Sequence, residues 1–367
     1  MTAVHGGDLT TVAREFGRER AALLDFSANV NPLGPPAAVA RVLLAAANDT
    51  SVLAAYPDSH ARELAARIGA RTGVPADAIV VANGGAALLA AAVRACAPRR
   101  CVVPVPAFSE YAHALDAAGC ALVPFALRAA DGFALDAGAL VARVRASRAT
   151  CCIVTNPHNP SGRAETASSI AALVRELQAC GCTAIVDEAF VDYVPEASIV
   201  APNRPLPDGT VVLRSLTKFY AIPGIRIGYA LASARAAARV RAMLPSWPAG
   251  TVDQRVAIAA LDDAAYAART LRANADARER FVHALRAAGA VVFEPAANFV
   301  LCDLSALCDD ATALRERLIR EHGVVIRTFP HEPALEHGAY ARLAVRRPHE
   351  NARLLDALAA CTRKDDR

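Results

Sequence analysis

Lys218 is the residue whose type and setting point most directly to chemistry. The chain has 40 Lys and Arg residues, but only Lys218 and Lys364 are lysines. Lys364 lies in a polar tail, whereas Lys218 lies in the largely apolar segment 214–226. A Lys amine can lose its proton and attack a carbonyl, while an Arg guanidinium stays charged. We therefore predict that Lys218 forms an imine with an aldehyde. The alternative is a solvated surface lysine.

Other residues able to bind a ligand follow the predicted strands. Apolar runs between helical segments predict strands at 79–82, 101–103, 150–155, 184–187, 211–214 and 227–231. This alternation implies an α/β fold with a mostly parallel sheet and helices on both faces. Ligands of such sheets bind beyond the carboxyl ends of the strands. The groups expected there are Gly84, Gly85, Phe108, Asn159, Asp187, Ser215 and Lys218. Their shared placement predicts one site.

Pyridoxal 5′-phosphate is a cofactor whose requirements these residues meet. It needs a Lys for its aldehyde, an acid at its ring nitrogen, donors for its phosphate and a flat group against its ring. Asp187 can keep the ring nitrogen protonated, and Asn159 can donate to the phenolic oxygen. Ser215 and Arg226, three residues before and eight after Lys218, can hold the phosphate. The alternatives are a helix cap or salt bridge for Asp187 and a surface ion pair for Arg226.

The segment 79–97 has the pattern of a phosphate-binding turn. A predicted strand runs into Gly84-Gly85 and then into a helical segment. Bare backbone N–H groups and the positive helix end would face an anion there. A plain tight turn explains the pattern equally well on its own. Phe108 follows the next strand, and it could stack on a planar ring or belong to the core.

Composition excludes several classes of protein. Hydrophobic residues make up 54% of the chain, so we expect a globular protein. The net charge is only +4, so we expect neither a basic surface for nucleic acid nor a polybasic patch for membranes. No apolar run predicts a membrane span, and the start of the chain lacks the pattern of a secretory signal, so a cytoplasmic location is expected. We interpret the ten cysteines as reduced core thiols. Cys180 and Cys182 are spaced like a weak metal-binding motif, but no second pair of cysteines stands near them, so no metal site is predicted.

We predict three parts along the chain. Residues 1–40 form an N-terminal arm, residues 41–251 the large ligand-binding domain, and residues 252–367 a smaller C-terminal α/β domain. The division at 252 follows the break Pro245-Ser246-Trp247-Pro248. A helical stretch of roughly 252–287 comes next, followed by short strands near 291–293, 299–301, 324–327 and 341–345.

Several motifs resemble those of the fold-type-I, aspartate aminotransferase-like enzymes that use pyridoxal phosphate. They are Asn159-Pro160-Ser161-Gly162, Asp187-Glu188-Ala189-Phe190 and Ser215-Leu216-Thr217-Lys218 with Arg226. The resemblance covers nearly the whole chain. Within these enzymes, three stretches are similar to the threonine-phosphate decarboxylase family: His5-Gly6-Gly7, 25–34 and 214–224. Histidinol-phosphate aminotransferases are close relatives that share the other motifs.

The resemblance implies decarboxylation of O-phospho-L-threonine to (R)-1-amino-2-propanol O-2-phosphate in cobalamin biosynthesis. A histidinol-phosphate or related aminotransferase is the alternative. By family position, the substrate would contact His5, Gly6, Asn29, Asn159, Arg327 and Arg342. Two Arg residues suit a phosphate and a carboxylate, and sequence does not separate Arg346 from Arg342. Tyr56 would reach the cofactor phosphate of a partner subunit, so the resemblance implies a homodimer.

The chain departs from the family pattern at two places. The Gly84-Gly85 turn continues as Ala86-Ala87 instead of an acidic or hydroxyl residue, so phosphate binding would depend on backbone N–H groups, Ser215 and Arg226. Phe190 stands where aminotransferases often carry a Tyr. A non-enzymatic regulator on the same fold usually lacks the Lys or adds a DNA-binding module, and neither applies here. A nucleotide-binding Rossmann protein is disfavoured because no Gly-rich fingerprint or P-loop occurs.

Overall fold

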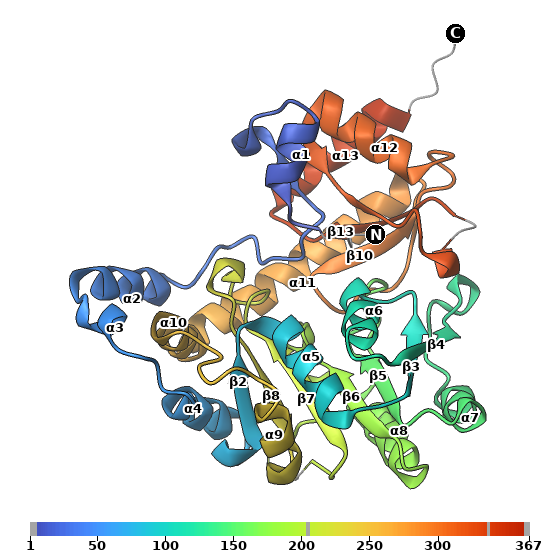
Figure 1. Cartoon of the computed structure of the whole chain (residues 1–367). Coiled ribbons are helices and arrows are strands. Elements are labelled where there is room, and N and C mark those ends of the chain that lie inside the picture. The colour runs from blue at the N-terminus through green and yellow to red at the C-terminus, as the bar shows by residue number, and fades with distance from the viewer. Residues whose placement is uncertain (1–5, 203–205, 336–337, 363–367) are drawn as a thin grey trace.

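A seven-stranded sheet forms the centre of the large domain in the computed structural model, which describes residues 6–202, 206–335 and 338–362 (Figure 1). In spatial order its strands are β2 (Ile79–Ala82), β8 (Gly228–Ala232), β7 (Thr210–Ser215), β6 (Thr183–Asp187), β5 (Cys151–Thr155), β3 (Arg100–Val105) and β4 (Ala121–Ala126). Only β8 runs antiparallel to its neighbours. The prediction of a mostly parallel α/β sheet is confirmed.

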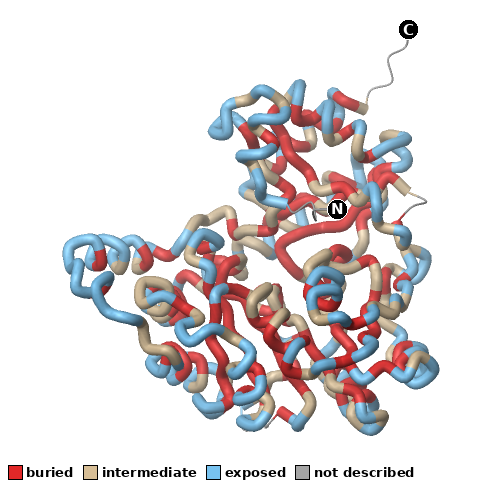
Figure 2. Tube along the Cα trace, in the orientation of Figure 1, coloured by how far each residue is buried: buried red, intermediate tan, exposed pale blue. Residues whose placement is uncertain are grey.

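Helices cover both faces of this sheet because neighbouring strand residues point to opposite sides. One face packs against α4 (Arg62–Thr72), α7 (Ala137–Ser147), α8 (Ala167–Ala179) and α10 (Thr251–Leu261). The other face packs against α5 (Gly84–Cys96), α6 (Ser109–Asp116) and α9 (Ala234–Arg241). The adjacent thiols of Cys151 and Cys152 illustrate the alternation, since they belong to different cores. Figure 2 shows the strands as the buried centre of the domain.

Side-chain caps fix where several helices begin. Asp136, Thr166 and Ser233 each accept a hydrogen bond from the backbone N–H three residues later, at the starts of α7, α8 and α9. Asp263 does the same for α11 (Ala264–Ala287) by accepting from Tyr266. The helical stretch expected over 252–287 is therefore divided into α10 and α11 by the pair Asp262-Asp263.

The smaller domain has its own sheet and core. Its strands are β12 (Arg327–Thr328), β13 (Tyr340–Ala344), β10 (Phe299–Asp303) and β9 (Val291–Val292), in that order and all antiparallel. The helices α12 (Ala311–Arg317) and α13 (Pro348–Thr362), the π-helical turn η7 (Leu318–His322) and the later part of α11 pack around it. The earlier part of α11 packs in the core of the large domain, so this helix joins the two cores.

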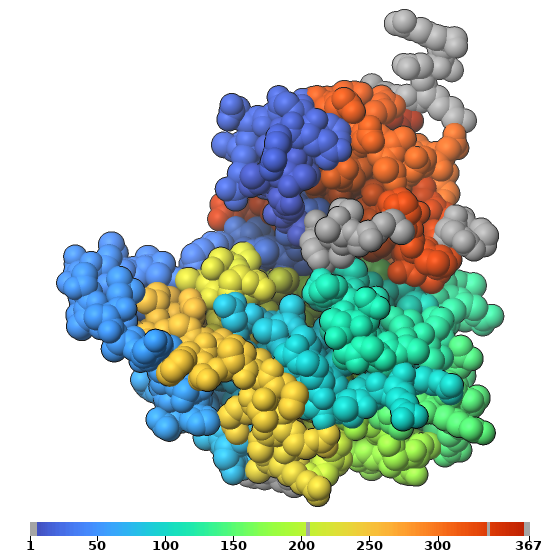
Figure 3. All heavy atoms as spheres, viewed as in Figure 1, coloured from blue at the N-terminus to red at the C-terminus, as the bar shows by residue number. Residues whose placement is uncertain are grey.

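The N-terminal segment packs on the smaller domain. It contains α1 (Leu9–Glu15) and β1 (Leu24–Asp25), and β1 pairs in parallel with β11 (Val324–Val325). Figure 3 shows this blue segment against the orange C-terminal part. The chain then crosses to the large domain and forms α2 (Ala37–Asn48) and α3 (Ser51–Ala54). The predicted division into residues 1–40, 41–251 and 252–367 stays a prediction.

None of the helices in the described ranges has the length and apolar character needed to cross a bilayer.

Candidate active site

The register of the large sheet brings the predicted groups to one edge. Thr155, the last residue of β5, pairs with Asp187, the last residue of β6. Ser215 ends β7 and pairs with Gly228, while Gly84 opens the helix after β2. Parallel strands end at the same edge, so these groups surround a common space.

Lys218 lies in this space, three residues beyond β7. Its Nζ atom donates to Thr217 Oγ1 at 3.2 Å, and its backbone carbonyl accepts from the N–H of Asn31 at 3.1 Å. Burial, together with the cations Arg226 and Arg342, lowers the pKa of Lys218 to about 8, while the carboxylate of Asp187 opposes this shift. A pKa near 8 gives the amine access to its neutral, nucleophilic form around neutral pH.

Asp187 is held by a tyrosine that the sequence analysis did not assign. The Tyr111 hydroxyl donates to Asp187 Oδ2 at 2.6 Å and lies 2.8 Å from Thr155 Oγ1. Oδ1 of Asp187 accepts from the N–H of Ala189 at 2.9 Å. Burial raises the pKa of Asp187, whereas the Tyr111 hydrogen bond and the charge of Lys218 lower it. Tyr111 lies three residues after Phe108 on α6, a helical spacing that could have indicated it.

Gly84 and the Arg226 guanidinium form one corner of the site, and Gly85 follows in the first turn of α5. Gly84 has φ +83°, and a Cβ atom there would lie 2.9 Å from Arg226 Nη2. Glycine therefore admits the guanidinium against the start of α5, where a side chain would interfere. Ser215 Oγ lies 2.8 Å from Thr217 Oγ1, so two hydroxyl groups stand near the same strand end. Such a set of N–H, hydroxyl and guanidinium donors suits a phosphate.

Arg342 joins the smaller domain to this site. It projects from β13, and its Nη1 donates to Asn159 Oδ1 at 2.7 Å while its Nη2 donates to the carbonyl of Ser27 at 2.7 Å. Burial lowers its pKa, and Arg327 lowers it further. The bond to Oδ1 leaves the NH2 group of Asn159 as its remaining donor. That arrangement agrees with the expected role of Asn159 as a donor to a ring oxygen.

Arg327 is the cross-strand neighbour of Arg342 in the β12–β13 pair. Burial lowers its pKa, and its guanidinium lies 5.5 Å from the ring centre of Phe329. Within the described part of the chain, neither Arg327 nor Arg342 forms an ion pair with a carboxylate. Two neighbouring, partly buried guanidinium groups repel each other, so their arrangement favours an anion between them.

Arg346 has a different environment from Arg342. Its Nη2 pairs with Glu350 Oε1 at 2.7 Å, and its Nη1 donates to the carbonyl of Asp25 at 2.9 Å. The guanidinium is therefore used to hold α13 and β1 together. Sequence did not distinguish these two arginines, but their partners do.

The N-terminal arm forms another wall of the site. Asn29 is buried, and its Oδ1 atom has no hydrogen-bond partner among the described residues. Asn31, which was not among the expected site residues, donates through Nδ2 to the Phe219 carbonyl at 2.8 Å. A Cβ atom at Gly6 would overlap the carbonyl of Ser27, so this glycine permits close packing of the arm. His5 lies outside the described residues.

Phe108, Tyr56 and Phe190 are the remaining residues that the sequence analysis named. Phe108 contacts Tyr111 edge-on, with ring centroids 5.7 Å apart, at the start of α6. Tyr56 is 78% exposed beyond α3 and stacks on Trp247 with centroids 4.2 Å apart. Its stacking partner Trp247 is not one of the groups described above around Lys218. Phe190 is buried edge-on against Phe299.

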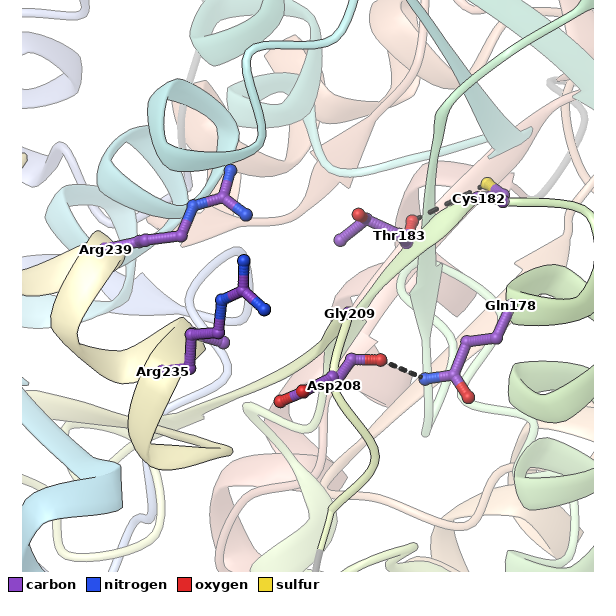
Figure 4. Close-up of a pocket in the computed structure, with 9 residues that line it drawn as sticks. Gln178, Cys182, Thr183, Asp208, Gly209, Arg235 and Arg239 are labelled. Atoms are coloured by element: carbon purple, nitrogen blue, oxygen red, sulfur yellow. Dashed lines mark hydrogen bonds between the residues drawn. The ribbon is translucent and has the colours of Figure 1, made fainter.

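A separate cavity lies at the other end of the sheet (Figure 4). Its volume is about 310 Å³, and Arg235 and Arg239 of α9 point toward it. Thr183, which lines it, begins β6, whereas Asp187 ends that strand about 13 Å away at the usual rise per residue. This cavity is therefore not part of the Lys218 site.

The residues at the strand ends fit pyridoxal phosphate. Lys218 provides the amine, and Asp187 provides a buried carboxylate at the end of β6. The Gly84 turn leaves a space beside Arg226 that a Cβ atom would fill. The buried Oδ1 atom of Asn29, on the N-terminal arm, also lacks a hydrogen-bond donor among the described residues, as expected beside a site that binds a ligand. An amine, a carboxylate and phosphate-binding donors are the groups that the cofactor's aldehyde, ring nitrogen and phosphate require.

The fold and the site define a pyridoxal phosphate-dependent enzyme, and comparison with known proteins agrees. The family model for aminotransferase class I and II matches residues 21–358. The chain belongs to this family.

Two relatives and one solved structure illustrate its position. The chain is 32% identical to the threonine-phosphate decarboxylase of Salmonella typhimurium, covering 98% of this chain and 96% of that protein. It is 31% identical to histidinol-phosphate aminotransferase 2 of Ralstonia nicotianae, covering 97% and 93%. The crystal structure of a histidinol-phosphate aminotransferase from Sinorhizobium meliloti, in complex with pyridoxal 5′-phosphate, has a TM-score of 0.88 at 24% identity, covering 99% and 95%. The last comparison shows the shared fold.

Proposed function

We propose that this enzyme decarboxylates O-phospho-L-threonine to (R)-1-amino-2-propanol O-2-phosphate, a step of cobalamin biosynthesis. The observation that carries the proposal is the pair of neighbouring guanidinium groups of Arg327 and Arg342, which have no carboxylate partner among the described residues. The substrate carries a carboxylate and a phosphate on adjacent carbon atoms, and guanidinium groups bind both. The similarity to the Salmonella decarboxylase supports the same reaction.

The residues of the chain divide the work of this reaction. When bound, pyridoxal phosphate supplies an aldehyde for the substrate amine and a ring that withdraws electrons from bonds at Cα. Asp187 would hold the proton of the ring nitrogen, and Tyr111 would keep that carboxylate ionised by donating to it. The two arginines would hold the anionic groups, so that the Cα–carboxylate bond stands perpendicular to the ring.

Lys218 would complete the proton balance. Cleavage of the Cα–carboxylate bond releases carbon dioxide and leaves its electron pair at Cα, which then takes up one proton. Lys218 or a water molecule would deliver it, and a pKa of about 8 lets the ammonium form of Lys218 do so near neutral pH. Aminotransfer would instead use Lys218 to remove a proton from Cα. The similarity to the Ralstonia aminotransferase supports that alternative.

A parallel assay tests the proposal. The purified holoenzyme is incubated with O-phospho-L-threonine while carbon dioxide is trapped, and separately with L-histidinol phosphate and 2-oxoglutarate while glutamate is measured. We expect carbon dioxide without glutamate, and no turnover by Lys218→Ala. Arg327→Gln should raise KM for O-phospho-L-threonine about 10-fold or more through loss of a charged contact, whereas the exposed-site control Arg280→Gln should not. Glutamate without carbon dioxide would establish the aminotransferase instead.

We also propose a homodimer in which the partner subunit's Tyr56 reaches the cofactor phosphate. Leu44, Leu53 and Tyr56 of the α2–α3 region are 65%, 69% and 78% exposed. Such clustered apolar exposure is typical of a contact surface, and a second copy is the partner that the family resemblance implies. Mixing inactive Lys218→Ala with inactive Tyr56→Ala should restore activity in mixed dimers. No recovery, with subunit exchange verified by mass, would contradict a shared site.

A further inference from the structure

Three side chains with metal-binding atoms meet in the smaller domain, apart from the Lys218 site. Glu321 and His322 lie on the π-helical turn η7, and Cys361 lies in the last turn of α13. Their ligand atoms all lie within 4.8 Å of one another. Glu321 Oε2 is 3.7 Å from Cys361 Sγ and 3.9 Å from His322 Nε2. In Figure 1 the helices α12 and α13 lie above β10 and β13, away from the large domain.

The spacing of these atoms is close to that of a tetrahedral zinc site. Zinc–sulfur bonds of about 2.3 Å and zinc–nitrogen or zinc–oxygen bonds of about 2.0–2.1 Å place neighbouring ligand atoms roughly 3.3–3.5 Å apart. The two separations from Glu321 Oε2 exceed this by a few tenths of an ångström, and His322 Nε2 lies within 4.8 Å of Cys361 Sγ. Side-chain rotations that draw the imidazole and the thiol together would therefore bring a sulfur, a nitrogen and an oxygen ligand around one ion.

His322 gives an independent reason to expect a ligand. Its Nε2 atom is buried and has no hydrogen-bond partner among the described residues. Buried polar atoms almost always have a partner, and the lone pair of a neutral imidazole is a common metal ligand. The side chain as a whole is 31% exposed, so an ion could reach the cluster from solvent.

Two arginines hold the segments that carry the cluster. Arg317 donates to Glu321 Oε1 at 3.1 Å and to the carbonyl of Cys361 at 2.8 Å, so Oε2 is the oxygen that faces the thiol. Arg353 donates to the carbonyl of His322 at 3.0 Å. A hydrogen bond to a ligating side chain, such as that from Arg317 to the Glu321 carboxylate, orients the ligand in metal sites. A thiolate and a carboxylate would also balance the charge of one divalent ion.

We propose that Glu321, His322 and Cys361 bind one zinc ion, with a water molecule in the fourth position. The mixed sulfur, nitrogen and oxygen set favours zinc over calcium or magnesium, which prefer oxygen ligands. The ion would link the end of α13 to η7. β11 begins two residues after His322 and pairs with β1 of the N-terminal segment, so the ion would also stabilise the strand on which that segment packs.

Zinc binding by the full-length holoenzyme tests the proposal. The protein is freed of metal with a chelator and titrated with zinc in competition with a chromogenic chelator. We expect one strong site in the wild type. His322→Gln and Cys361→Ser should each weaken it at least ~100-fold, more than the loss of an outer hydrogen-bond partner does. Cys308→Ser, a partly exposed cysteine of the same domain, is the matched control and should keep the site.

A structural readout separates this site from other thiols. Zinc should raise the Tm of the wild type and of Cys308→Ser, and it should slow hydrogen exchange in residues 318–326. It should do neither in His322→Gln, whose partly exposed side chain makes this variant the safer test if Cys361→Ser does not fold. Equal amounts of calcium or magnesium should have no effect. Absence of a strong zinc site in the wild type, or its full retention in His322→Gln, would overturn the proposal.

Discussion

Replacing Tyr111 with Phe removes one hydroxyl group from the site and leaves the ring in place. That hydroxyl donates to Asp187 Oδ2 at 2.6 Å. The hydrogen bond lowers the pKa of Asp187, which burial raises. Without it, Asp187 should take up a proton more readily and hold the ring nitrogen of pyridoxal phosphate less firmly.

The size of the effect follows from the kind of bond lost. A hydrogen bond to a charged group contributes about 1.5–3 kcal/mol net, which corresponds to roughly 10- to 150-fold in an equilibrium constant. We therefore expect the Tyr111→Phe apoenzyme to bind pyridoxal phosphate that much more weakly than the wild type. Because the variant has the higher Asp187 pKa, the loss should grow as the pH falls.

Spectrophotometric titration of apoenzyme with pyridoxal phosphate, between about pH 6 and 8.5, measures this affinity. Tyr193→Phe is the matched control because Tyr193 is also buried, but its hydroxyl has no hydrogen-bond partner among the described residues. The same titration in an Asp187→Asn background tests the coupling, since Tyr111→Phe should then have little further effect.

Either of two results would refute the reasoning. One is that Tyr111→Phe binds the cofactor as tightly as Tyr193→Phe at every pH. The other is that Tyr111→Phe weakens binding equally with and without the Asp187 carboxylate. In that case the hydroxyl would act through packing or through Thr155, which lies 2.8 Å away.

Three further predictions concern groups around the site. The rate at which apoenzyme reacts with pyridoxal phosphate should rise with pH and level off above about 8, because the neutral amine of Lys218 is the form that reacts. Arg342→Met removes a positive charge that lowers the pKa of Lys218, so the midpoint of this pH profile should move to higher pH. An unchanged midpoint would contradict the assignment. Gly84→Ala should lower the free energy of unfolding by about 1–2 kcal/mol in urea denaturation, because φ is +83° and the new Cβ would meet Arg226; equal stability would show that the turn relaxes. Arg214→Met should destabilise the protein by about 3–5 kcal/mol, because its partner Glu188 is fully buried and would lose its ion pair; an unchanged urea midpoint would show that this pair contributes little.

The strand pattern predicted the large domain well because most of its strands, unlike the edge strand β4, are buried on both faces. Runs such as Ile79–Ala82 and residues 184–186 are apolar throughout, and each is followed directly by a polar residue, Asn83 or Asp187. Their order in the sheet could not be predicted, because it depends on pairing between distant segments. The insertion of β8 between β2 and β7, antiparallel to both, is one such result.

The arginines show why parts of the site could not be predicted. Arg342 and Arg346 lie four residues apart in one segment, and both are long cations near the end of β13. Only the folded chain shows that Arg346 is paired with Glu350 while Arg342 lacks a carboxylate partner in the described residues. Ion pairing depends on which elements meet, and sequence spacing does not contain that information.

The sequence by itself determined the cofactor chemistry of this protein. A chain that uses arginine nearly everywhere keeps Lys218 among apolar residues, and its strand-end residues meet the needs of pyridoxal phosphate. Tertiary structure alone decided which groups act on those residues. Tyr111 reaches Asp187, Asn31 binds the backbone of Lys218, and Arg342 meets Asn159. These contacts join segments 76, 187 and 183 residues apart, so they exist only after the sheet and the arm have packed.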